Sequence, residues 1–352
     1  MPSCSRRTVV CPGEVGVYHC WNRCVQQAWL CGLDPVSGFD YEPRRTVIEQ
    51  VEQQLAALFA IDIGFHAEMA NHLHLILRTR PDVAATYSED EVLRRWWIVT
   101  RLKRTGSGQI EEPTEEQLAR ERNRARDIDM LRLRLADVSW FMGTLCEHLA
   151  RRFNLESGKR GTFWEHRFGC RSLEDEAAIL LCGIYVDLNP IRAGEACAPE
   201  AARYTSAYNR IQGWQQAQAG VSAEHAAGPD GWLCPLTIPA DDPAQLGPVP
   251  ARLPWRASDK GLLSISLEKY LELLDWTGRQ IRSKQLQASI PASLAPILER
   301  LGIRPEHWVQ SVDTFDCIFG HVVGALNRLR EAACRVGRRW FRGLAASAAT
   351  FG

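Results

Sequence analysis

The sequence predicts a mixed α+β fold: an antiparallel sheet with helices on one face, extended by a helical insertion and a helical C-terminal region. A run of strand-forming residues at 15–22 precedes a helical pattern over about 44–59. Two more apolar runs, 61–69 and 72–78, are separated by Ala70 and Asn71, as in a hairpin. Strand, helix, strand, strand is the first half of a ferredoxin-like split β-α-β unit.

The first strand and the first helix are predicted from different spacings. The run Val-Gly-Val-Tyr-His-Cys-Trp-Asn at 15–22 is rich in strand formers and ends in polar residues. Val47, Val51, Leu55 and Leu58 instead recur every three or four residues, so they share one face of a helix.

The second block of elements follows a polar stretch. From about 79 to 136 the chain is rich in Arg and Glu and is interrupted by Gly and Pro, which predicts a helical insertion. Core-like periodicity at 135–149 predicts a helix, and the aromatic segment 162–168 is expected to form a strand and a turn. Ser172 followed by Asp175 is a capping-box pattern, so we expect a helix to start there.

The C-terminal part of the chain divides into a linker and helices. Ala, Gly, Gln and Pro become frequent at 213–250, which is typical of a linker. The region 251–352 has helical patterns at 267–276, 294–301 and 315–340, and we expect a small helical unit that could bind DNA.

The composition excludes several classes of protein. The chain has 352 residues, with 42 Lys+Arg against 42 Asp+Glu, 45% hydrophobic and 24% charged residues, which is typical of globular proteins and not of disordered ones. No apolar run approaches the roughly 20 residues of a membrane span, and the start does not resemble a signal peptide. We therefore expect a cytoplasmic protein with no membrane partner, whose 12 Cys are reduced thiols.

The basic residues are unevenly distributed. Only 5 of the 42 are Lys, and Arg residues gather at 94–104, 120–134 and 328–342, with Trp residues in the first and last of these segments. Arg binds phosphate through a planar fork, and basic residues interleaved with aromatics suit a nucleic-acid groove. A solvated helix face is the more common meaning of such a charge run, so both interpretations remain open.

His72 and His74 are the first candidates for functional residues. Side chains two residues apart in a strand lie on the same face, about 6 to 7 Å apart along it, so two imidazoles can converge on one cation. Two half-exposed histidines without a function are the simpler interpretation. Tyr185 and Asn189, four residues apart on the helix predicted before Pro190, supply partners because both project from one face of that helix.

Three ordered motifs resemble those of single-tyrosine transposases of the His-hydrophobic-His (HUH) class, especially the REP-associated branch. They are Met-Ala-Asn-His-Leu-His-Leu at 69–75, Gly-Thr-Phe-Trp-Glu-His-Arg-Phe at 161–168 and Ile-Tyr-Val-Asp-Leu-Asn-Pro-Ile-Arg-Ala-Gly at 184–194. The run Tyr-His-Cys-Trp-Asn-Arg at 18–23 also matches the first strand of that family. The resemblance implies a catalytic domain over 1–212.

This resemblance implies cleavage and rejoining of single-stranded or hairpin DNA. It implies that His72 and His74 bind Mg²⁺ or Mn²⁺, that Asn189 is the third ligand, and that Tyr185 is the nucleophile. A phenol with a pKa near 10 is a poor nucleophile at pH 7, so a cation that polarises the phosphate is chemically reasonable. Attack would leave a 5′-phosphotyrosine and a free 3′ hydroxyl, and a second 3′ hydroxyl could reseal the strand.

Four Arg residues are candidates for DNA contacts. Arg167 and Arg192 lie in the motifs, and Arg338 and Arg339 lie in the last basic segment. Each is also well explained as a surface residue. The sequence leaves the oligomeric state open, with a homodimer as one arrangement.

The chain departs from the family pattern at Glu165, where Gln is usual, and a carboxylate there would repel phosphate. His166 adds an imidazole that could compete as a ligand. One alternative is a catalytically inactive, domesticated DNA-binding protein of the same fold. Another is a hydrolase with a His-rich strand, which commonly needs a third alternating His where this chain has Ile76.

Overall fold

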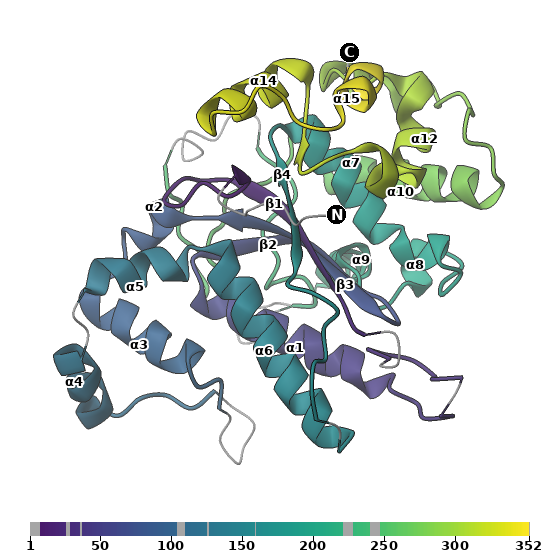
Figure 1. Ribbon diagram of the computed structural model, residues 1–352. Coiled ribbons are helices and arrows are strands. Elements are labelled where there is room, and N and C mark those ends of the chain that lie inside the picture. Colours follow the sequence, from purple (N-terminus) through teal and green to yellow (C-terminus); the bar gives the residue numbers. More distant parts are fainter. Residues whose placement is uncertain are drawn as a thin grey trace.

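A five-stranded sheet organises the part of the chain that the computed structural model describes, and its strand order is β2-β3-β1-β4-β5 (Figure 1). The described residues are 8–25, 29–35, 37–103, 110–124, 127–158, 160–220, 228–239 and 247–351. The strands are β1 (Val17–Arg23), β2 (Ile61–Glu68), β3 (His72–Thr79), β4 (Gly169–Leu173) and β5 (Val322–Val323). β1 to β4 pair antiparallel, and β5 joins the β4 edge in parallel. The predicted mixed α+β class is confirmed.

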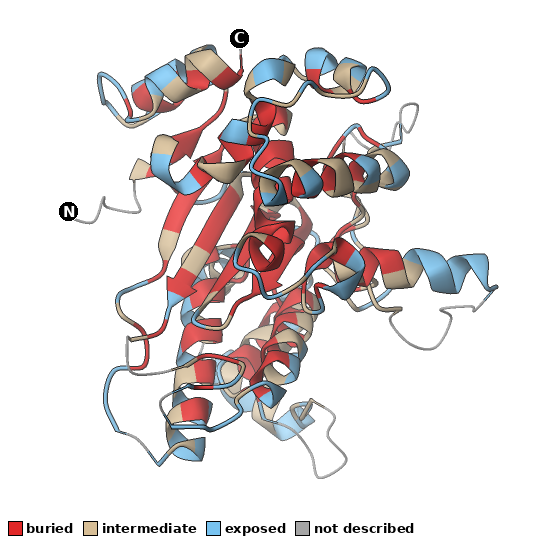
Figure 2. Ribbon diagram, turned by 90° about the vertical axis from the view of Figure 1, so that its right-hand side faces the viewer, coloured by how far each residue is buried: buried red, intermediate tan, exposed pale blue. Residues whose placement is uncertain are grey.

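Helices cover both faces of the sheet, whereas the sequence predicted helices on one face. α1 (Pro43–Leu58) and α6 (Val138–Glu156) form one core with the face that carries Leu75. α7 (Glu176–Asp187) forms a second core with the face that carries Ile76. Every residue of β2 is buried, and Figure 2 shows the strands in red at the centre of the molecule. The one-face prediction was wrong because the central strands carry apolar residues that need a cover on each face, such as Leu75 on one side and Ile76 on the other.

The predicted hairpin is present, and its turn is closed by a hydrogen bond of 2.8 Å from the Met69 N–H to the His72 carbonyl oxygen. The predicted capping box was wrong. Asp175 alone caps α7, because its carboxylate accepts from the Ala178 N–H at 2.8 Å. Ser172 lies inside β4, where it pairs with Tyr18 of β1. The strand expected at 162–168 begins only after that segment, at the start of β4.

The segment 79–136 is helical, and part of it joins the main core. Val92 and Trp97 of its longest helix are buried against the α1 side of the sheet. Many of its Arg side chains are paired with carboxylates inside the segment, for example Arg94 with Glu112 at 2.6 Å. Residues 104–109 and 125–126 of the predicted insertion lie outside the described part. The helices are α2 (Pro81–Ala84), α3 (Glu89–Val99), α4 (Glu115–Arg124) and α5 (Ile128–Leu135).

The C-terminal helices pack on the α7 side of the sheet (Figure 1). Asp187 of α7 anchors two of them, because its carboxylate accepts from the Tyr270 hydroxyl at 2.6 Å and from the Ala207 N–H at 3.0 Å. The helices are α8 (Asn189–Arg192), α9 (Ser206–Gln218), α10 (Leu267–Arg282), α11 (Ala295–Arg300), α12 (Trp308–Asp313), α13 (Phe315–Ile318), α14 (Leu326–Arg335) and α15 (Leu344–Thr350), with 3₁₀ turns at Pro199–Ala201 and Pro305–His307.

The single helix predicted over 315–340 is wrong. β5 interrupts it, because Val322 and Val323 add backbone hydrogen bonds to the open edge of β4. The predicted domain limits, with a linker at 213–250, stay predictions. Trp232 in that stretch is buried in the main core, and residues 221–227 and 240–246 lie outside the described part.

The described residues bear on membrane insertion and on the state of the thiols. Among them, no helix combines the length and hydrophobicity that crossing a bilayer requires. None of the cysteines in the described part of the chain forms a disulfide, and most of them are buried.

Candidate active site

A cavity of about 730 Å³ lies where β1, β3 and the 161–168 loop meet. His72 and His74 of β3 line it, together with Arg23, Arg167 and Asp316. The cavity therefore joins the first two motifs to a residue that lies far along the chain, in α13.

His72 and His74 lie on one face of β3, and their ring centroids are 4.8 Å apart. His72 Nδ1 lies 2.6 Å from the Asn71 side-chain oxygen, which can only accept, so Nδ1 carries the proton and Nε2 keeps a lone pair. His74 Nδ1 lies 2.9 Å from Nε2 of His19, and its own Nε2 is buried without a hydrogen-bond partner in the described structure. A free imidazole nitrogen on each ring is what a cation site requires.

Both imidazoles are neutral at pH 7. Burial, with the charge of Arg23, lowers the pKa of His72 to about 4. Burial and the neighbouring His72 lower the pKa of His74 well below its ordinary value. The neutral form is the one that binds metal, so the pair fits a divalent cation.

Tyr185 lies on α7 directly across from these histidines. Its ring centroid is 5.7 Å from that of His74 and 6.0 Å from that of His19. The side chain is only 2% exposed, because Phe315 stacks on it at a centroid distance of 4.9 Å. The Tyr185 hydroxyl donates a hydrogen bond to the Asp316 carboxylate. Burial and the charge of Asp316 raise the pKa of Tyr185, so phenolate is scarce at neutral pH.

Asp316 is itself held by a cation. Arg171 of β4 donates to its carboxylate at 2.7 Å. Burial opposes ionisation of Asp316, but Arg171 outweighs it and lowers the pKa of the carboxyl below its ordinary value. Asp316 is therefore ionised at neutral pH and can accept a proton.

Asn189 lies one helical turn after Tyr185 but in the next helix. α7 ends at Asp187 and α8 begins at Asn189, because Pro190 has no N–H to donate to the Val186 carbonyl oxygen and so cannot continue the hydrogen bonds of α7. The prediction of one continuous helix was therefore wrong. The Asn189 side chain is buried, and its Nδ2 has no hydrogen-bond partner among the described residues. Asn189 does not line the cavity.

The four Arg candidates occupy three different places. Arg167 is exposed at the cavity. Arg192 lies with its guanidinium 4.8 Å from the Tyr185 ring centroid and donates to Asp313, so it covers the tyrosine. Arg338 and Arg339 are exposed in the turn after α14 and do not line the cavity.

Sequence reasoning missed Phe315, Asp316 and His19. Phe315 and Asp316 lie about 130 residues after Tyr185, in a region with no motif, and nothing in their local sequence indicates this contact. His19 could have been predicted as a site residue, because it lies in the run 18–23 that matches the family. Its side chain lies on the same face of the sheet as that of His74 on the neighbouring strand β3.

The fold and the cavity define a mixed α+β protein with neutral histidines beside a buried tyrosine. No protein-family model and no curated protein sequence matches this chain. The solved "Structure of the REP associates tyrosine transposase bound to a REP hairpin" is similar at 10% sequence identity with a TM-score of 0.35, over 62% of this chain and 88% of that one.

Proposed function

We propose that this protein is a metal-dependent DNA strand transferase, a transposase of the single-tyrosine HUH class. One observation carries the proposal: the Tyr185 ring lies 5.7 Å from the imidazole of His74, although more than 100 residues separate them in the chain. The three ordered motifs and the β2-β3-β1-β4 strand order of a ferredoxin-like sheet support it.

His72 and His74 would hold Mg²⁺ or Mn²⁺, with Asn189 as the proposed third ligand. When bound, such an ion would polarise the scissile phosphate and stabilise its developing charge. The amide oxygen proposed as the third ligand is not among the usual Zn²⁺ ligands, which favours Mg²⁺ or Mn²⁺ at this position.

Tyr185 would attack the phosphorus and form the phosphotyrosine ester while the bond to the 3′ oxygen breaks. Because the pKa of Tyr185 is raised, the proton must leave during the attack. Asp316 already accepts the hydrogen bond of that hydroxyl, so we assign it as the proton acceptor. The 3′ oxygen takes a proton from solvent and leaves as a hydroxyl.

Single-stranded or hairpin DNA is the substrate that the rim of the cavity suits. Arg23 and Arg167 are exposed there, and neither forms an ion pair within the described part of the chain. A flexible backbone could bring a phosphate past them to the histidines, with Arg side chains contacting neighbouring phosphates.

A second candidate function is DNA binding without cleavage. It is favoured by the burial of Tyr185 beneath Phe315 and Asp316, because a nucleophile must reach its phosphorus. For cleavage, the scissile phosphate has to reach the Tyr185 hydroxyl from the cavity while Asp316 keeps its contact with that hydroxyl.

The test is a covalent-capture assay with a pool of labelled hairpin oligonucleotides that differ in stem and overhang. We expect a protein–DNA adduct that survives denaturation, needs Mg²⁺ or Mn²⁺ and disappears in Tyr185→Phe. Tyr208→Phe, a matched loss of one hydroxyl from α9, should keep the adduct. Binding of hairpins without any adduct would favour the second candidate, and an adduct that persists in Tyr185→Phe would refute the assigned nucleophile.

A further inference from the structure

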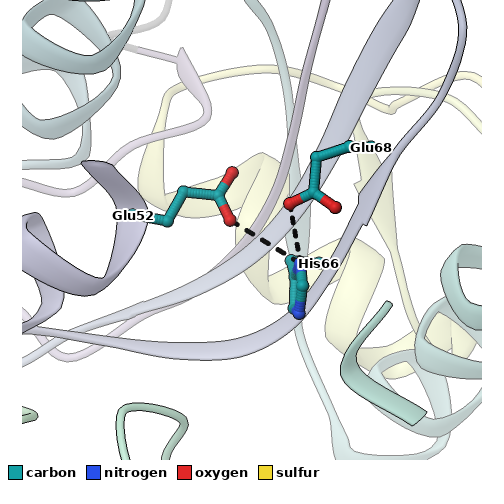
Figure 3. A group of neighbouring side chains, drawn as sticks. All are labelled: Glu52, His66 and Glu68. Carbon is teal, nitrogen blue, oxygen red and sulfur yellow. Dashed lines mark hydrogen bonds and ion pairs between the residues drawn. The ribbon is translucent and has the colours of Figure 1, made fainter. Parts of the chain in front are cut away.

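A second cluster of ligand-type side chains lies on the other face of the sheet. His66 and Glu68 are two residues apart in β2, so they point to the same side. They pair across the hairpin with Leu75 and Leu73, whose side chains face the α1 core, whereas His72 and His74 face α7. Glu52 reaches the cluster from α1, as Figure 3 shows.

The three side chains form a compact group with no solvent contact. Their ligand atoms all lie within 4.8 Å of one another. His66 Nδ1 is 2.9 Å from Glu68 Oε1 and 3.6 Å from Glu52 Oε2. The exposed fraction of each side chain is 0% or 1%. Neither oxygen of Glu52, nor Oε2 of Glu68, has a hydrogen-bond partner in the described structure.

The surroundings fix the proton on the far nitrogen of His66. The Asn209 amide nitrogen donates to Glu49 at 2.9 Å and to the Pro229 carbonyl at 3.0 Å, and both of these groups accept. Asn209 therefore turns its oxygen toward His66 Nε2, at 2.8 Å, and Nε2 must carry the hydrogen. This is how a metal-binding histidine is usually oriented by its neighbours.

The nitrogen that faces the carboxylates therefore carries a lone pair unless the ring takes a second proton. A lone pair and two buried carboxylates repel one another in a medium of low dielectric constant. Of the described residues, only His66 forms an ion pair with either carboxylate.

The spacing of the donor atoms suits a transition metal. Metal–ligand bonds of about 2.0 to 2.1 Å in a tetrahedron place the ligand atoms about 3.3 Å apart. The two measured separations from His66 Nδ1, 2.9 and 3.6 Å, bracket that value. One imidazole and two carboxylates are a mixed nitrogen and oxygen set, which suits Zn²⁺ better than Mg²⁺ or Ca²⁺.

We propose that Glu52, His66 and Glu68 form a structural binding site for a divalent transition-metal ion, with Zn²⁺ as the preferred ion. The ion would cross-link α1 to β2 and neutralise the two carboxylates. Because the site is closed to solvent, the ion would enter during folding and exchange slowly afterwards. This site is independent of the cation proposed at His72 and His74.

The experiment measures metal content in the full-length chain with the first site removed. The His72→Ala/His74→Ala double variant is purified, refolded from denaturant with Zn²⁺ and dialysed, and its metal is counted by mass spectrometry. We expect close to one Zn²⁺ per chain, and loss of that ion when Glu52→Gln is added. Glu147→Gln, the same substitution at an exposed position of α6 outside the cluster, is the matched control and should keep the ion.

Refolding with Co²⁺ gives a second readout that does not depend on activity. We expect the visible absorption of a nitrogen- and oxygen-ligated Co²⁺ site of low coordination number in the double variant, and a lower melting temperature after refolding in chelator. A folded double variant that contains no Zn²⁺ and shows no Co²⁺ spectrum would overturn the proposal and assign the cluster as a protonated imidazole between carboxyl groups. An ion that survives Glu52→Gln would also refute it.

Discussion

The Tyr185 hydroxyl donates its hydrogen bond to Asp316, and the C-terminal region thereby covers the tyrosine that the motifs single out. Asp316 therefore both covers the Tyr185 hydroxyl and stands ready to accept its proton. Asp316 is ionised because Arg171 pairs with it, so the acceptor is ready at neutral pH. If Tyr185 acts as a nucleophile, its hydroxyl proton leaves along this hydrogen bond to Asp316.

Replacement of Asp316 tests its role directly. Asp316→Asn keeps the shape but removes the base, so we expect the rate of adduct formation to fall by about 10²- to 10⁴-fold, the usual contribution of a general base. Rates are measured by denaturing gel at saturating DNA. Asp313→Asn, which alters the neighbouring contact to Arg192, is the control and should have a smaller effect. A faster rate in Asp316→Asn would mean that the residue only covers the tyrosine.

The cavity rim provides a test of DNA binding. Arg23→Gln or Arg167→Gln each removes one exposed cation, so we expect weaker binding of single-stranded DNA and a salt slope smaller by about 0.7 for each phosphate that the variant no longer neutralises. Arg122→Gln is the control, because Arg122 pairs with Asp90 in the insertion. Affinities are measured by fluorescence anisotropy over a range of salt concentrations. Equal slopes in all three variants would place the DNA elsewhere.

The packing of α7 on β2 gives a prediction about stability. A Cβ added at Gly183 would lie 2.7 Å from the Phe65 ring, and Phe65 is fully buried. Gly183→Ala should therefore lower the free energy of unfolding by about 1 to 3 kcal/mol, as overpacking usually does. Gly143→Ala on α6 has no atom within 4 Å of the new Cβ and should stabilise by about 0.5 to 1 kcal/mol. Denaturant titration distinguishes these outcomes, and an unchanged midpoint for Gly183→Ala would show that α7 packs less tightly.

The buried His19 makes the fold sensitive to acid. Burial, with the charge of Arg171, lowers its pKa to about 3. The unfolded chain binds a proton at His19 below about pH 6.5, while the folded chain does so only near pH 3, so stability falls as the pH drops from 6.5 toward 3. At pH 5 this group should cost about 2 kcal/mol.

Denaturation in chelator at pH 7 and pH 5 measures this effect. His19→Gln should lose less stability between the two pH values than the unchanged chain. The half-buried His307, changed to Gln in the same way, is the control and should leave the difference as it is. A pH dependence identical in His19→Gln and the unchanged chain would contradict the prediction.

Local sequence patterns were sufficient for much of the framework. The three- or four-residue spacing of Val51 and Leu55 predicted α1, and the apolar runs around the hairpin predicted β2 and β3 to within two residues. Such elements can be predicted because a buried helix face repeats every three to four residues and a buried strand face repeats every two. β5 was not readable, because a two-residue strand exists only where the edge of β4 offers it hydrogen bonds.

The two sites show the same contrast between features that a local pattern predicts and contacts that only the folded chain creates. The local sequence was enough to place His72 and His74 on one face of β3, because alternation along a strand is fixed by the backbone. It could not determine that Asp316 meets Tyr185, or that Glu52 meets His66. Those contacts join segments whose distance along the chain carries no local signal. The packing of α13 on α7, and of α1 on β2, brings them together, because burying apolar surface fixes which polar side chains become neighbours.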